Sequence, residues 1–194
     1  FLDGFVARLF KAESELGAQL DSLADVVTFG VAPAMILYQF LRMSYAKESG
    51  AVDISIVFLM PAFLVAIAGA YRLGRFNIDK EQSVIFKGVP IPAVGLLVAS
   101  LPIIYWNTEH SIIIDLLLNK WFLYGFIIVV SWLMVSKIPL LALKFKNYSF
   151  ANNSPKYILL AVSLVSILLL GWLSVPVIFI AYIILSLLFK NKLA

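Results

Sequence analysis

Three aspartates in the first 25 residues carry the most informative chemistry of the sequence: Asp3, Asp21 and Asp25. Asp21 and Asp25 are four residues apart, a spacing that places two side chains on one face of a helix. All three lie in or beside apolar segments, where an ionised carboxylate costs roughly 2.5–3.5 kcal/mol unless something compensates it. Clustered carboxylate oxygens suit one or two Mg²⁺ or Mn²⁺ ions, which usually hold phosphates as well. At a membrane surface such a site predicts phosphoryl transfer on a lipid.

Small residues accompany the acids at the same spacing. Gly17 lies four residues before Asp21. The preceding segment has two further pairs that are four residues apart, Asp3 with Ala7 and Gly4 with Arg8. Because the loop between the two segments is short, we expect them to pack antiparallel, with the acids facing one another. Glycine at these positions removes side-chain bulk where the backbone and a ligand come close.

Two other interpretations of the acids compete with a metal site. The acids could mark a helix end near the lipid headgroups, paired with Arg8 and Lys11. A cation transporter or proton relay also uses acids inside the membrane. Here the acids lie toward one end of their helices, and the second half of the chain has no matching acids where an inverted-repeat transporter would carry them. The pattern therefore favours the metal site.

The composition restricts the class of protein that must position these residues. Of the 194 residues, 62% are hydrophobic and 13% are charged, and the mean hydropathy is +0.99. Soluble domains have about 45–50% apolar and about 25% charged residues, so the sequence predicts an all-α, polytopic integral membrane protein. The chain has no cysteine and one histidine, His110. Thiolate chemistry, disulfides and iron–sulfur clusters are thereby excluded, and a histidine-based metal site is disfavoured.

The hydropathy pattern predicts a helical bundle of six spans, preceded by the end of a truncated helix over residues 1–12. A span needs about 20 apolar residues, and Pro61 predicts a kink in the second span. Residues 157–189 are too long for one span, so we divide them near Gly171–Pro176 into a hairpin of two short helices. The other four predicted spans are residues 18–43, 54–73, 88–106 and 121–136. We treat residues 1–194 as a single transmembrane catalytic domain.

The distribution of lysine and arginine predicts the orientation. If the loop at 9–16 is cytoplasmic and the spans alternate, twelve basic residues lie at cytoplasmic ends and three lie on the far side, namely Arg42, Lys47 and Lys120. Cytoplasmic loops carry an excess of Lys and Arg, so we expect a protein of the cell (inner) membrane with its site facing the cytoplasm. The net charge of +4 reflects this orientation, and no nucleic-acid partner is expected. His110 is expected to be a solvated residue of the far-side loop at 107–120.

The early residues resemble the signature of the CDP-alcohol phosphotransferase superfamily, D-x2-D-G-x2-A-R-x8-G-x3-D-x3-D. The matching residues are Asp3, Gly4, Ala7, Arg8, Gly17, Asp21 and Asp25, and the first aspartate would lie immediately before Phe1. Further runs resemble the phosphatidylserine synthase branch, namely LDSLADVVTFGVAPA at 20–34, RLGRFN at 72–77, FKGVPIPA at 86–93 and LMVSKIPLLALKFK at 133–146. The resemblance covers the core at 1–146, whereas the hairpin at 157–189 has no recognisable motif.

The resemblance implies an enzyme that transfers a phosphatidyl group from CDP-diacylglycerol to the hydroxyl of L-serine and releases CMP. Asp3, Asp21 and Asp25 would bind the divalent metal, and Asp25 would also act as the general base. The cytidine diphosphate site would be lined by Gly4, Ala7, Arg8 and Gly17. The expected partners are CDP-diacylglycerol, L-serine and membrane lipids, with a homodimer as the candidate assembly. Other acceptors of the superfamily, namely glycerol 3-phosphate, an inositol phosphate or choline, stay open.

The carboxylate of serine needs a cation near the cytoplasmic surface. The candidates are Arg72 and Arg75, which are three apart at the end of a predicted span, and Lys87, which precedes the expected start of the next helix at Gly88. We rank Arg75 first, Arg72 second and Lys87 third, because an arginine fork fits a carboxylate better than an ammonium does. The alternative for each residue is an ordinary cation that snorkels at a span end.

The sequence starts inside the signature, so we interpret it as a fragment. Residues 1–194 alone lack the first aspartate and most of the helix that carries Asp3. The few residues left of that helix cannot cross about 30 Å of hydrocarbon. We therefore expect residues 1–194 to be inactive alone.

Overall fold

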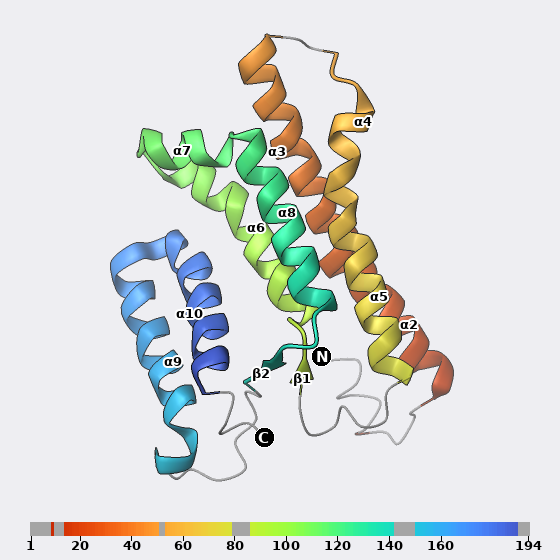
Figure 1. Ribbon diagram of the computed structural model, residues 1–194, viewed down its shortest axis with the longest axis vertical. Coiled ribbons are helices and arrows are strands. Elements are labelled where there is room, and N and C mark those ends of the chain that lie inside the picture. Colours follow the sequence, from red (N-terminus) through yellow and green to blue (C-terminus); the bar gives the residue numbers. More distant parts are fainter. Residues whose placement is uncertain (1–8, 10–13, 51–52, 79–85, 142–149, 190–194) are drawn as a thin grey trace.

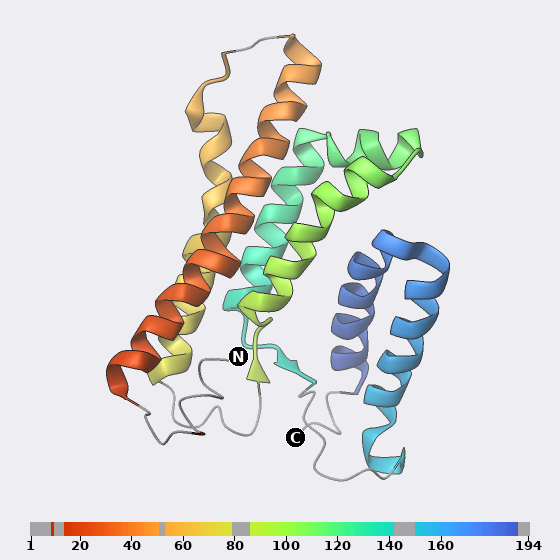
Figure 2. The same cartoon turned by 180° about the vertical axis from the view of Figure 1, so that it is seen from behind.

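The computed structural model of the chain describes residues 9, 14–50, 53–78, 86–141 and 150–189. These residues form a bundle of helices with one short β-ribbon at one end (Figures 1 and 2). The elements follow in the order α2 (Glu15–Val26), η1 (Val27–Val31), α3 (Ala32–Ser49), α4 (Ile56–Leu59), η2 (Met60–Phe63), α5 (Leu64–Ile78), β1 (Phe86–Lys87), α6 (Ile91–Asn107), α7 (Ser111–Leu117), α8 (Lys120–Val135), β2 (Pro139–Leu140), α9 (Phe150–Leu170), η4 (Gly171–Leu173) and α10 (Ser174–Leu188).

The first described helix is longer than the predicted segment at 18–43. It begins at Glu15, because the side chain of Ser14 accepts a hydrogen bond of 3.0 Å from the backbone N–H of Gly17 and caps the helix. The helix adopts π geometry in η1 and then continues as α3. Gly50, with a φ of 64°, caps the far end of α3 in the left-handed conformation that glycine favours. The stretch that we predicted as a polar loop therefore contributes the first turn of α2.

Two predicted breaks are confirmed. Pro61 lies in the 3₁₀ turn η2, which interrupts the segment between α4 and α5. Gly171, with a φ of 52°, begins η4, where the chain folds back so that α9 and α10 lie side by side as a hairpin (Figures 1 and 2). The two arms have 21 and 15 residues, and 15 helical residues extend only about 22 Å. The second arm is therefore shorter than the hydrocarbon core of a bilayer.

The predicted count of six spans is not confirmed. Among the described residues, three helical segments are long and apolar enough to cross a membrane: Glu15–Glu48, Ile56–Ile78 and Asn153–Leu188. A fourth is reached only if α7 and α8, which are bent by 64° relative to each other, count as one broken span. The remaining apolar helix, α6, has 17 residues. The fold class of the described part of the chain is nevertheless all-helical apart from two strands of two residues each.

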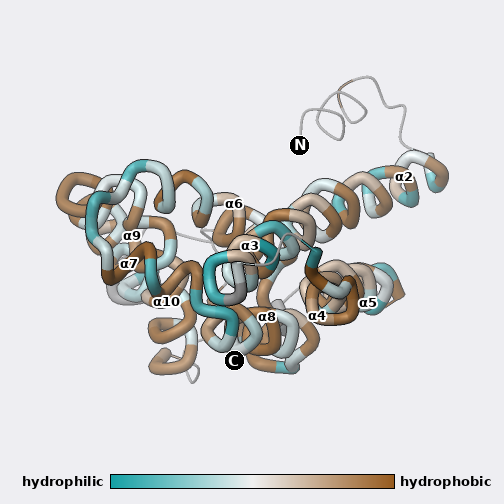
Figure 3. The backbone as a smooth tube through the Cα atoms, turned by 90° about the horizontal axis from the view of Figure 1, so that it is seen from above, coloured by the Kyte–Doolittle hydropathy of each residue, from teal (hydrophilic) through white to brown (hydrophobic). Residues whose placement is uncertain are grey.

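The core lies between α3, α5, α6 and α8 and consists of aliphatic side chains. Leu37, Val65, Ile91 and Leu123, one from each helix, are fully buried. The outward faces are also apolar, since large side chains such as Ile112 and Leu168 are more than four-fifths exposed. Figure 3 shows the same distribution along the backbone, with hydrophobic residues dominating α9 and α10 and hydrophilic residues recurring along α2. Apolar surface of this extent is expected of a protein that contacts lipid.

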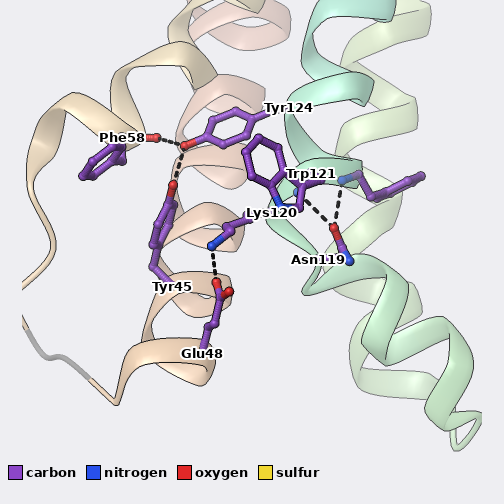
Figure 4. A network of polar contacts seen from close by, with 8 residues as sticks. Tyr45, Glu48, Phe58, Asn119, Lys120, Trp121 and Tyr124 are labelled. Carbon is purple, nitrogen blue, oxygen red and sulfur yellow. Dashed lines mark hydrogen bonds and ion pairs between the residues drawn. The ribbon is translucent and has the colours of Figure 1, made fainter.

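Two tyrosines tie the helices together at the end of the bundle where α3 ends and α8 begins. The hydroxyl of Tyr124 donates a 2.7 Å hydrogen bond to the carbonyl oxygen of Phe58 (Figure 4). Because its proton is used there, Tyr124 accepts the 3.0 Å hydrogen bond that joins it to the hydroxyl of Tyr45. Asn119 caps α8 by accepting hydrogen bonds from the backbone N–H groups of the two residues after Lys120. This end of the bundle is therefore closed by polar contacts between α3, α4 and α8.

Two of the three cations predicted for the far side form ion pairs at this same end. The ammonium of Lys47 on α3 lies 2.6 Å from a carboxylate oxygen of Asp115 on α7. Lys120 on α8 pairs with Glu48 on α3 (Figure 4). The predicted loop at 107–120 therefore contains a helix, α7, and His110 is the exposed residue immediately before it.

Candidate active site

The two described aspartates of the predicted metal site both lie on α2. Asp21 is exposed and Asp25 is half-buried. Because the backbone between them is α-helical, their four-residue spacing places both carboxylates on one face, as predicted. Gly17 lies one turn before Asp21 on the same face. It is next to the side chain of Ser14, which caps the helix. α2 therefore presents two carboxylates beside a residue that has no side chain.

A polar contact that the sequence analysis did not single out fixes α2 against α5. The side-chain amide of Asn77 donates a 3.0 Å hydrogen bond to the hydroxyl of Ser22. Ser22 in turn donates to the carbonyl oxygen of Ala18 at 3.2 Å. Ser22 follows Asp21 directly, so this contact sets the distance between the acids and the end of α5. Asn77 is the last residue of the run RLGRFN, and the run was the signal that could have identified it.

The π turn η1 begins two residues after the second aspartate. It inserts one turn of wider helix between Asp25 and α3, and such turns are frequent at functional sites. The turn places Phe29 against α6, where a Cβ atom on Gly95 would lie 2.9 Å from the Phe29 ring and 3.1 Å from its Cα. Only glycine allows this close approach. The packing of η1 on α6 therefore fixes the direction in which α2 leaves the core.

Arg72 and Arg75, the first two candidates for the acceptor carboxylate, lie on α5 three residues apart. Arg75 donates a 3.1 Å hydrogen bond from Nη1 to the backbone carbonyl of Val135, at the end of α8. Arg72 is only 7% exposed, and its buried Nε has no hydrogen-bond partner among the described residues. A buried donor without a partner costs free energy unless a ligand satisfies it. A bound anion would therefore supply the hydrogen-bond acceptor that the Nε of Arg72 lacks among the described residues.

Lys87, the third candidate, does not precede a helix. It lies in β1, which pairs antiparallel with β2 in the register Phe86 with Leu140 and Lys87 with Pro139. The next helix, α6, begins at Ile91, because the prolines at 90 and 92 allow a helix to start there but not to extend backwards. The prediction that Lys87 opens this helix is therefore wrong.

The β-ribbon is held between the start of α6 and the end of α8. The N–H of Gly88 donates to the carbonyl oxygen of Ile138 at 2.9 Å, and the N–H of Val89 donates to that of Leu133 at 3.1 Å. We call one end of the bundle the ribbon end (Figures 1 and 2). The ribbon lies there, α2 begins there, and α5, α8 and α10 end there. Arg72, Arg75 and the α2 aspartates belong to helices that meet this end.

Gly88→Ala is expected to destabilise the ribbon. Gly88 has a φ of 76°, and a Cβ atom there would lie 2.5 Å from the carbonyl oxygen of Met134 and 2.7 Å from that of Ser136. The left-handed backbone alone costs an alanine about 1–2 kcal/mol. This corresponds to a fall in Tm of about 2–8 °C in a chain of this length, measured by thermal unfolding in detergent. The matched control is Gly125→Ala, where a Cβ atom meets nothing within 4 Å; an equal fall in both variants would contradict the prediction.

The remaining predicted site residues lie outside the described residues: Asp3, Gly4, Ala7 and Arg8. A metal set of three acids would need Asp3 together with the two acids on α2. Within the described part of the chain, no three carboxylate, histidine or cysteine residues gather into a metal-binding group. The oxygen donors of Asp21 and Asp25 on one helix face fit part of the ligand set of a hard divalent cation.

The fold and the site together define an apolar helical bundle with two carboxylates on one helix face at its ribbon end. The family model for CDP-alcohol phosphatidyltransferase matches residues 1–143. The chain belongs to this family, and the resemblance found in the sequence is thereby confirmed. The match ends before α9, so the hairpin lies outside the matched residues.

The chain is also similar to proteins named CDP-diacylglycerol–serine O-phosphatidyltransferase. It is 42% identical over 139 residues to the protein from Helicobacter pylori strain J99, covering 71% of this chain and 53% of that protein. The protein from Mycobacterium leprae is 34% identical over 198 residues, covering 95% of this chain and 58% of the relative. The protein from Methanocaldococcus jannaschii is 43% identical over 96 residues, which is 50% of this chain and 41% of the relative. The chain spans about half the length of the curated relatives it matches.

Proposed function

We propose that the protein transfers a phosphatidyl group from CDP-diacylglycerol to L-serine and forms phosphatidylserine and CMP. The observation that carries this proposal is the placement of Asp21 and Asp25 on one face of α2, inside the residues that match the family. The names of the relatives support serine as the acceptor and CDP-diacylglycerol as the donor. In this reaction the serine oxygen forms a bond to the phosphorus that carries the diacylglycerol, and the bond from that phosphorus to CMP breaks.

We assign the metal to Asp21 and Asp25 together with Asp3. A Mg²⁺ or Mn²⁺ ion held there would neutralise charge on the diphosphate and on the leaving CMP. Asp25 also takes the proton of the serine hydroxyl, since an alcohol at neutral pH is a weak nucleophile without a base in hydrogen-bond reach. Asp25 is half-buried, whereas Asp21 is exposed, so we assign the second role to Asp25.

The donor's cytidine diphosphate is assigned to the segment that leads into α2. Gly17 supports this assignment, because it leaves one turn of the acidic face of α2 without a side chain. The other proposed donor residues are Gly4, Ala7 and Arg8. An arginine such as Arg8 can hold a phosphate with two parallel hydrogen bonds.

The serine carboxylate is assigned to Arg72, with Arg75 and Lys87 as further cations of the acceptor site. The buried Nε of Arg72 has no partner among the described residues, whereas one donor of Arg75 is already bound to Val135. We therefore reverse the order in which we ranked the two arginines from sequence. A guanidinium has five N–H donors, so Arg75 retains others for a ligand. This assignment places the acceptor at the end of α5, next to the helix that carries the acids.

We propose further that the protein lies in the cell membrane with its ribbon end toward the cytoplasm, where serine is found. The excess of lysine and arginine at this side of the predicted spans supports the orientation. A homodimer is proposed as the assembly, on the resemblance alone.

The experiment that tests the function is a CMP-release assay with a panel of alcohols. The full-length protein is incubated with CDP-diacylglycerol, Mg²⁺ or Mn²⁺, and L-serine, glycerol 3-phosphate, inositol phosphate or choline in turn. We expect CMP release with serine, and background release with the other three. CMP release with a different alcohol would agree with the chemistry of the family but would overturn the assignment of serine as the acceptor. Absence of release with every alcohol would overturn the proposal of a transferase.

A further inference from the structure

We propose that Tyr182 and Ser186 of α10 are positioning residues of the acceptor site, which they reach through the β-ribbon and through Arg72. The inference rests on the proposed function, since it concerns the same site. It assigns a role to the C-terminal hairpin, which carries no recognisable motif and lies beyond residue 143, where the family match ends.

The two side chains hold both polar backbone groups of one residue, Leu141. The N–H of Leu141 donates to the hydroxyl of Ser186 at 3.1 Å. The hydroxyl of Tyr182 donates to the carbonyl oxygen of Leu141 at 3.2 Å. Ser186 completes the arrangement by donating to the backbone carbonyl of Tyr182 at 2.7 Å. Because Tyr182 and Ser186 are four residues apart on a helix, they face Leu141 from the same side of α10.

The hydrogen bond to Ser186 is buried and the one from Tyr182 is partly buried, so α10 supports the residue that it holds. Ser186 is fully buried and Leu141 is 2% exposed. Water therefore cannot replace the hydroxyl oxygens when they are removed, and the backbone groups of Leu141 would lose their partners. A local rearrangement of the chain at Leu141 is the expected response.

Leu141 is connected directly to the acceptor site. It follows β2, which pairs with β1 and thereby with Lys87. The chain just before β2 is the end of α8, where the carbonyl oxygen of Val135 accepts the hydrogen bond of Arg75. A movement of Leu141 is therefore passed to two of the three cations that we assign to serine.

Tyr182 also reaches the third cation. Its phenol and the guanidinium of Arg72 are close enough to interact electrostatically, and Arg75 is a charged neighbour of Arg72. The phenol proton is used in the hydrogen bond to Leu141, so the oxygen can act toward other groups only as an acceptor. An oxygen lone pair is a favourable neighbour for a buried guanidinium. Tyr182 thus binds the chain beside the ribbon and is an electrostatic neighbour of the cation.

The test uses variants that remove only the hydroxyl groups. In the full-length protein we expect Tyr182→Phe and Ser186→Ala each to raise the KM for serine about 2- to 12-fold, the equivalent of one neutral hydrogen bond of about 0.5–1.5 kcal/mol. The KM for CDP-diacylglycerol should stay unchanged. Ser186→Thr keeps the hydroxyl and should restore the KM for serine. A fall in kcat with both KM values unchanged would overturn the inference.

Matched controls separate positioning from general damage. Ser163 on α9 donates to the carbonyl four residues earlier at 2.7 Å, as Ser186 does, but on the other arm of the hairpin. Tyr71 is an exposed tyrosine on α5. Ser163→Ala and Tyr71→Phe should leave the KM for serine unchanged. If Ser163→Ala has the same effect as Ser186→Ala, the effect comes from the hairpin as a whole and the inference is wrong.

A second measurement does not depend on the reaction. Amide hydrogen exchange over residues 133–141 should become faster in Tyr182→Phe and Ser186→Ala, and remain unchanged in the two controls. If exchange becomes faster but the wild-type protein shows no serine-dependent CMP release, the proposed function fails and the ribbon contact stands. If serine-dependent release is present and exchange does not change, the inference alone fails.

Discussion

Replacement of Asp25 by asparagine is expected to lower kcat about 10²- to 10⁴-fold while CDP-diacylglycerol still binds. Loss of a positioned general base has this magnitude, and asparagine keeps the shape of the side chain while losing its basicity. Asp25 is the half-buried member of the α2 pair, and the adjoining turn η1 fixes its backbone against α6. Turnover is measured as CMP release, and donor binding by titration with CDP-diacylglycerol.

Two further aspartate variants make this prediction specific. Asp21→Ala should weaken the apparent affinity for Mg²⁺ or Mn²⁺ and for the donor, because Asp21 is assigned to the metal and not to proton transfer. Asp53→Asn changes an exposed acid in the segment between α3 and α4, at the opposite end of the bundle, and should leave turnover unchanged. An Asp25→Asn protein within a few-fold of wild-type kcat would refute the role of Asp25 as base.

Replacement of Arg72 by alanine is expected to raise the KM for serine about 10- to 150-fold. A charge-assisted hydrogen bond contributes about 1.5–3 kcal/mol, at about 1.4 kcal/mol per tenfold change in affinity. Arg72 is buried and its Nε lacks a partner among the described residues, so a bound carboxylate would supply an acceptor that this part of the chain does not offer. Arg75→Ala should have a smaller effect, because Arg75 already donates to Val135.

Arg72→Lys and Arg42→Ala serve as the comparisons. Arg72→Lys keeps a positive charge but loses the planar fork, so its KM for serine should lie between those of the wild type and the alanine variant. Arg42 is exposed on α3 and its replacement should have no effect. A rise in the KM for CDP-diacylglycerol with an unchanged KM for serine would show instead that Arg72 holds a phosphate of the donor.

Features of the fold that depend on short stretches of sequence could be predicted. The apolar composition predicted the helical class. Pro61 predicted the interruption at η2, and Gly171 predicted the turn of the hairpin. The four-residue spacing of Asp21 and Asp25 predicted that they share one helix face, because helical periodicity alone decides which residues share a face. The family followed from the signature residues and is confirmed by the match over residues 1–143.

Features that depend on contacts between distant segments could not be predicted. The β-ribbon pairs two residues near position 86 with two near position 139, and strands this short leave no periodic pattern. The wrong expectation that Lys87 precedes a helix follows from that omission. The burial of Arg72 and the contact between Asn77 and Ser22 also arise from packing between helices. A hydropathy pattern carries no information about such packing. The span count is not confirmed among the described residues, where hydropathy does not register the bend between α7 and α8 or the short length of α10.

The most direct test of the account is to measure phosphatidylserine and CMP in the same reaction. The full-length protein, in detergent, receives CDP-diacylglycerol and isotopically labelled L-serine, with Mn²⁺ or Mg²⁺ in one arm and a chelator in the other. The account predicts that label enters the lipid fraction in a one-to-one ratio with CMP, and that both products disappear in the chelator arm. CMP release without label in the lipid, or full turnover in chelator, would contradict it.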